Sequence, residues 1–248
     1  MDTKREHHPV GPRSTAQEAH FDGREMAMVH TMFRREFRLA GGVVRRVGCG
    51  DSRRAHVVAH HLRFIGATLH HHHCCEDSHV WPLLGRRAAS RVSAHLLKVM
   101  EQHRQVDAIQ AEVDARLPIW SCSATAESRD RLAGALDRLA TALIEHMDYE
   151  ESHIVPVMEA HIDLAEWNHI VQATTSGLDP SNSLLVLGMS MYEAESDVIE
   201  HTIENMPVEL RAGIRATAAL AYAEHAQLIH GSATPPRSTE IARSAADR

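Results

Sequence analysis

The sequence has few aromatic residues and few of the β-branched runs from which sheets are built. Phe, Trp and Tyr together make up 4% of the chain, while hydrophobic residues make up 44%. Because strands favour aromatic and β-branched side chains, this shortage argues against a β-sheet. With 248 residues, the chain can bury a substantial core without help from a disulfide or a metal. We therefore expect an all-α protein in which any bound metal serves function.

Long apolar segments are also missing. No stretch approaches the roughly 18 apolar residues of a membrane span, and the first residues lack the apolar centre of a secretory signal. We therefore expect a cytoplasmic protein without a membrane partner. The net charge is −7 and the basic residues form no block, which argues against nucleic acid as a partner.

Cysteine is scarce, and its spacing indicates neither disulfide nor thiolate-metal chemistry. The four cysteines form no CxxC pair, and two of them are adjacent: Cys49, Cys74, Cys75 and Cys122. We expect reduced thiols. Lysine is rarer still, and its scarcity beside many alanines is typical of a bacterial protein from a GC-rich genome. Motifs for a serine nucleophile, a phosphate-binding loop or a dinucleotide are absent.

Histidine, in contrast, is abundant. The chain has 21 histidines, and many stand in segments with a helical pattern, where imidazole brings no propensity advantage. Capping residues and prolines predict four long helices, at about 22–47, 51–79, 87–116 and 126–155, the last three of which stop near Pro82, Pro118 and Pro156. The short connections between them predict an antiparallel four-helix bundle.

Beyond the bundle, further helices are predicted at about 163–175, 181–205 and 208–230. The predicted organisation is a disordered arm at 1–20, a bundle at 21–160, a C-terminal helical extension packing on the bundle at 161–231, and a disordered tail at 232–248.

Each long helix carries an apolar seam with spacings of three and four, and each seam is interrupted by polar groups. The interrupting residues are His30 on the first helix, His72 and Glu76 on the second, His103 on the third, and His146 and Glu150 on the fourth. Burying four imidazoles and two carboxylates costs several kcal/mol unless partners compensate them. A shared cation is the simplest compensation.

One segment occurs twice. The stretch from His72 to Pro82 recurs from His146 to Pro156 at a constant offset, with His, Glu, Ser, His and Pro matching. In both copies His precedes Glu by four residues, which stacks the two side chains on one helix face. Imidazole and carboxylate without thiolate suit iron or manganese. The alternatives are exposed His–Glu pairs or hydrogen-bonded core histidines without a cofactor.

Over about residues 22–160 this pattern resembles the hemerythrin HHE family, and the chain looks like a bacterial member with a C-terminal helical extension. The resemblance implies a four-helix bundle around two iron ions, joined by an oxygen bridge, with manganese the less favoured metal. It also implies that Glu76 and Glu150 bridge the irons, with terminal ligands at His30, His72, His103 and His146.

The sequence departs from hemerythrin on the third helix. Hemerythrin has a second histidine four residues after the first one, whereas this chain has Asp107 four residues after His103. His225, on the seam of a late helix, is our candidate for a seventh ligand or a capping residue, and Asp107 is its rival. We expect three other histidines to support the ligands from outside or to lie on the surface: His73, His79 and His153.

The site predicted from sequence supports three functions. The leading hypothesis is a non-haem di-iron protein that binds or senses oxygen or related small oxidants. The alternatives are a di-iron enzyme acting on hydrogen peroxide or nitric oxide, and an iron or redox sensor acting through a protein partner. The sequence leaves the oligomeric state open.

Overall fold

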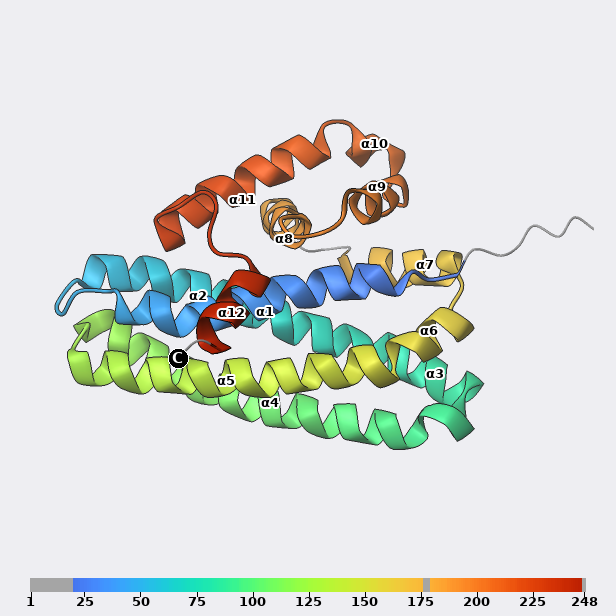
Figure 1. Ribbon diagram of the computed structural model, residues 1–248, viewed down its shortest axis with the longest axis horizontal. Helices are drawn as coiled ribbons and strands as arrows, with labels where there is room; N and C mark the ends of the chain where they lie inside the picture. Colours follow the sequence, from blue (N-terminus) through green and yellow to red (C-terminus); the bar gives the residue numbers. More distant parts are fainter. Residues whose placement is uncertain (1–19, 176–178, 247–248) are drawn as a thin grey trace, which may run out of the picture.

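The computed structural model describes residues 20–175 and 179–246, and every regular element in these two ranges is helical. Four long helices lie side by side (Figure 1): α1 (Gly23–Arg45), α2 (Ser52–Cys75), α4 (Ala89–Ser123) and α5 (Ala126–His153). Around the bundle, α1 packs on α2 and α5, and α4 also packs on α2 and α5. The predictions of an all-α chain and of a helical bundle are confirmed.

Side-chain caps fix where three of these helices begin. Asp22 accepts a hydrogen bond from the Arg24 N–H at the start of α1, and Asp51 accepts one from the Arg54 N–H at the start of α2. Thr125 does the same for α5. Caps of this kind satisfy amide groups that have no partner within the helix. The helix starts expected from the sequence at Asp22 and Asp51 therefore agree with the structure.

The second helix does not stop before Pro82. It passes into a π-helical turn, η1 (Glu76–Val80), and then into α3 (Trp81–Arg87), where Pro82 occupies the first turn. The Trp81 N–H bonds to the Glu76 carbonyl across this turn, and Pro82, which has no N–H, interrupts the backbone hydrogen bonds at the junction of η1 and α3. The extra residue of the π turn rotates the chain that follows, and such turns often occur at functional sites.

The third long helix also continues past its predicted end. Pro118 lies inside α4, which ends at Ala124 in a left-handed conformation (φ 44°). Leu117 and Trp120, on either side of the proline, are both fully buried. Their packing offsets the hydrogen bond that proline removes from the helix. The prediction that this helix ends near Pro118 was therefore wrong.

The helices between residues 180 and 230 form a second layer over α1 and α2 (Figure 1). The extension consists of α7 (Leu164–Thr175), α8 (Pro180–Met191), α9 (Ser196–Glu204), α10 (Val208–Arg211) and α11 (Ile214–His230), following the short α6 (Val155–His161). The predicted helices at 181–205 and 208–230 are each two helices, the second pair being separated at Gly213 (φ 73°). A Cβ at Gly188 would lie 2.1 Å from the Ala218 carbonyl oxygen, so glycine permits the close contact of α8 with α11.

The end of the chain differs from the sequence prediction. Residues 232–246 are described, and α12 (Ser238–Ala246) lies across α1 (Figure 1). Ser238 donates from its Oγ to the Thr31 carbonyl (3.2 Å) and from its amide to Glu193 Oε2 (2.7 Å). These distant partners order a segment whose composition alone suggested disorder. The predicted arm at 1–20 lies outside the described residues apart from His20.

None of the helices in the described ranges is long and apolar enough to cross a membrane.

Candidate metal centre

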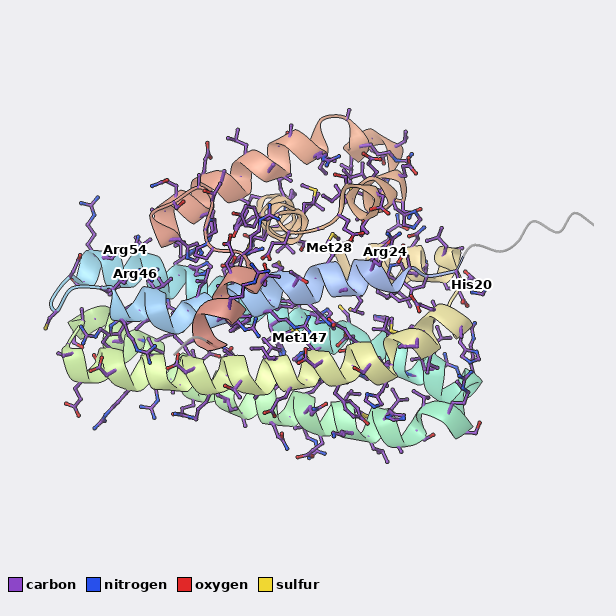
Figure 2. All side chains as sticks on the ribbon, in the orientation of Figure 1. His20, Arg24, Met28, Arg46, Arg54 and Met147 are labelled. Carbon is purple, nitrogen blue, oxygen red and sulfur yellow. The ribbon has the colours of Figure 1, made fainter. Side chains whose placement is uncertain are left out.

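A polar layer separates two apolar clusters in the bundle core. One cluster includes Phe33, Leu69 and Leu143, and the other includes Met26 and Ile154. Between them the six ligands predicted from sequence come together, each at most 2% exposed except His72, whose side chain is 16% exposed: His30, His72, Glu76, His103, His146 and Glu150. Met147 marks the level of this layer on α5 (Figure 2).

The layer has two halves that share carboxylates. On one side, His72 Nε2 lies 3.1 Å from Glu76 Oε1 and 3.3 Å from His30 Nε2. On the other side, His103 Nε2 lies 3.5 Å from Glu76 Oε2, so the two oxygens of one carboxylate face opposite halves.

The second glutamate also lies between the halves. Glu150 Oε2 is 3.7 Å from His30 Nε2 and 3.4 Å from His146 Nε2. Donor atoms therefore converge in two groups that could each hold a metal ion: His30, His72 and Glu76, and His73, Glu76, His103 and His146.

Most of these buried donor atoms have no hydrogen-bond partner. Both oxygens of Glu76 and of Glu150, both ring nitrogens of His73 and of His146, and Nε2 of His103 lack one. Buried polar atoms are nearly always paired, because an unpaired one costs roughly 1–3 kcal/mol. The unpaired atoms face one another. A cation bound between them would give these atoms the partner that they lack.

The acid–base properties of the layer lead to the same conclusion. Burial and the nearby Glu150 raise the pKa of Glu76 well above its usual range, and burial also raises the pKa of Glu150. Burial and the neighbouring histidines lower the pKa of His72 well below its usual range and that of His146 to about 2. A neutral imidazole has a free nitrogen lone pair with which it can bind a metal ion. A bound cation would also stabilise the ionised form of the two carboxyl groups.

Two carboxylates hold histidines from outside the layer. His103 Nδ1 lies 3.1 Å from Asp77 Oδ1, and His30 Nδ1 lies 2.9 Å from Glu151 Oε1. In each case the carboxylate leaves the Nε2 atom facing the layer. A ligating histidine usually donates its other N–H to such a partner, which fixes its ring and raises its basicity.

Comparison with protein families identifies the domain that contains the polar layer. Residues 24–158, more than half of the chain, match the hemerythrin HHE cation binding domain. The chain belongs to this family. Comparisons with curated proteins and with solved structures gave no match. The HHE domain thus comprises α1 to α6 with the polar layer inside it, and the later helices are additional to it.

The HHE domain brings a fifth histidine into the layer, one that the sequence analysis expected outside the ligand set. His73 is 3% exposed, and its ring stacks on that of His103 with centroids 4.0 Å apart. Its ring also lies 5.1 Å from that of His146. The repeat has Met147 at the matching position, so no internal symmetry pointed to His73.

The other candidates lie elsewhere. Asp107 is exposed and faces His70, while His79 and His153 are exposed. His225 Nε2 lies 3.0 Å from His61 Nδ1, and His61 precedes His72 by about 16 Å along α2. His225 is therefore not brought to the polar layer, because α11 packs against an earlier part of α2.

Proposed function

We propose that the HHE domain is a non-haem di-iron protein that binds or senses oxygen or related small oxidants. The observation that supports this most strongly is the sharing of carboxylates: Glu76 and Glu150 each face histidines of both halves. Glu76 directs one oxygen towards each half, and Glu150 approaches histidines of both halves with its Oε2 atom. Carboxylates placed between two groups of histidines suit a pair of ions. Iron is favoured because the donors are nitrogen and oxygen without sulfur.

We assign the proposed ligands to two ions according to the half of the layer in which they lie. His30 and His72 would hold one, and His73, His103 and His146 the other, with Glu76 and Glu150 contributing to both. His73 thereby takes the place that the sequence left open between His225 and Asp107. A pair of iron ions supplies electrons to, or a binding position for, a small oxidant.

The two halves differ in their number of imidazoles, and this difference favours ligand binding at one of them. The half with His30 and His72 has one histidine fewer, so it has more room for an external molecule. Phe33 borders this half, its ring 5.4 Å from that of His72. An aromatic ring beside His72 suits a small uncharged molecule better than an ion.

Metal analysis and absorption spectroscopy of iron-loaded protein test the proposal. We expect two iron ions per chain and an ultraviolet–visible charge-transfer band that changes when oxygen or peroxide is added to the reduced protein. His146→Gln should lose iron, whereas His153→Gln, a change at an exposed histidine of the same helix, should keep it. Protein from iron-replete cells without metal, or an unchanged spectrum with every oxidant, would contradict the proposal. Sustained turnover of peroxide or nitric oxide would favour the enzyme alternative over simple binding.

A further inference from the structure

A second polar cluster lies at the interface between the bundle and the extension. It consists of Glu36 from α1, His61 from α2 and His230 from the last turn of α11. Glu36 and His61 are each 1% exposed, and the His230 side chain is 4% exposed. Two of the three residues lie in the HHE domain and the third lies outside it.

The cluster is separate from the polar layer. Glu36 follows His30 by six residues, which turns its side chain by about 240° around the helix axis, towards the extension and away from the bundle interior. His61 precedes His72 by eleven residues, or about 16 Å along α2. The two groups of ligands therefore share no residue and lie at different levels of the molecule.

Three atoms converge in this cluster without hydrogen-bond partners. Glu36 Oε2 lies 3.4 Å from His230 Nε2 and 3.6 Å from His61 Nε2, and none of the three atoms has a hydrogen bond. These separations exceed those of ordinary hydrogen bonds. Ligand atoms at about 2.0–2.2 Å from a tetrahedral zinc ion lie about 3.4 Å from one another, which matches both.

Glu36 Oε1 and His61 Nδ1 have hydrogen-bond partners that turn the unpaired atoms of these two residues inward, whereas Nδ1 of His230 has none. Glu36 Oε1 accepts from Arg35 Nε (2.9 Å) and from the Tyr222 hydroxyl (3.1 Å). His61 Nδ1 lies 3.0 Å from His225 Nε2, so a proton on Nδ1 would be donated to His225 and the lone pair on Nε2 would face the cluster.

The charged groups around the cluster are compatible with an additional cation. The Arg35 guanidinium lies 2.9 Å from Glu36 and 2.9 Å from Glu193, so one positive group faces two carboxyl groups. Burial alone would raise the pKa of Glu36, but His230, Arg35 and His61 hold it well below its usual range. Burial lowers the pKa of His61 to about 3, which keeps its imidazole neutral.

We propose that Glu36, His61 and His230 bind one divalent transition-metal ion, with zinc the best fit, at the interface between α11 and the bundle. Two imidazoles and one carboxylate leave a fourth tetrahedral position for water. Arg54, at the start of α2 (Figure 2), donates to the carbonyls of Leu228 and Ile229 and so holds the end of α11 in place beside the site. Bound metal would fasten the extension to the HHE domain. The proposal does not depend on iron in the polar layer.

Zinc titration of metal-free, full-length protein against a chromophoric chelator tests the site. We expect His230→Gln and His61→Gln each to lose the same single ion, or to bind it at least tenfold more weakly. His60→Gln is the matched control, because His60 is the exposed neighbour of His61, and it should bind zinc as the wild type does. His146→Gln should affect only the ions of the polar layer, so failure of one site is distinguishable from failure of the other.

A second measurement removes the ambiguity of a variant that folds poorly. Zinc should slow hydrogen exchange in α11 of the wild type and of His60→Gln, but not in His230→Gln, with helix content compared by circular dichroism. Equal zinc number and affinity in wild type and His230→Gln would overturn the proposal. Loss of the ion in His60→Gln as well would also overturn it.

Discussion

The Nδ1 atom of His30 lies 2.9 Å from Glu151 Oε1, while Nε2 of the same ring faces Glu150. Two consecutive carboxylates of α5 thus face opposite sides of one imidazole. On the other half of the layer, Asp77 follows Glu76 and contacts His103 in the same way. Each carboxylate between the two halves is therefore followed by one that orients a histidine contributed by another helix.

Glu151→Gln should weaken metal binding while leaving the fold intact. The substitution keeps the shape of the side chain but removes the charge that holds the His30 ring, and loss of such a partner typically costs tenfold or more in metal affinity. Competition titration with iron(II) or cobalt(II) measures the change. Asp148→Asn is the control, because Asp148 also contacts Arg34 but not His30. Equal weakening in both variants would assign the effect to Arg34.

His73→Phe should remove affinity for one of the two ions. Phenylalanine preserves the stacking on His103 but offers no nitrogen, so we expect at least a tenfold loss at one ion and a smaller change at the other. Asp107→Asn, at the rival position, should bind metal as the wild type does. If Asp107→Asn loses metal and His73→Phe keeps it, the assignment of the fifth histidine is wrong.

Gly188→Ala should destabilise the packing of α8 on α11. The added methyl group would meet the Ala218 carbonyl at 2.1 Å, and overpacking of this kind costs about 1–3 kcal/mol. Gly134→Ala, where the nearest atom outside the local backbone is the Arg138 guanidinium at 4.0 Å, should be neutral or stabilising by up to about 1 kcal/mol. Urea denaturation compares the two, and equal stabilities would show that α8 and α11 can separate without cost.

Glu25→Gln should raise stability at neutral pH. Glu25 accepts from the Trp167 indole N–H at 2.7 Å, and its burial raises its pKa above the ordinary 4.5. The unfolded chain therefore releases this proton first, so the free energy of unfolding falls as pH rises from about 4.5 through the raised pKa. Glutamine avoids that loss while still accepting from Trp167.

Glu25→Gln should raise the free energy of unfolding by roughly 1 kcal/mol at pH 7, which is the usual cost of burying a polar group that is incompletely compensated. This gain should disappear near pH 4. Chemical denaturation at both pH values measures it. A variant less stable than wild type at pH 7 would mean that the contact of Glu25 with His201, at 3.5 Å, outweighs the cost of burial.

The sequence by itself determined the repeated part of the centre. His72 with Glu76, and His146 with Glu150, converge because a separation of four places two side chains on one helix face whatever the rest of the chain does. Seam spacing likewise predicted that His30 and His103 face inward. The acids at 77 and 151 match between the two copies of the repeat, so the signal for the orienting carboxylates was also present in the sequence.

Only the tertiary structure placed His73 beside the predicted ligands and His225 away from them. The position of His73 depends on how α2 packs beside α4, and it has no counterpart in the repeat. His225 and His230 are placed by the docking of α11, which rests on long-range features such as the close approach at Gly188. Helical periodicity is local and is therefore readable from sequence, whereas the face on which a distant helix lands depends on packing across the whole molecule.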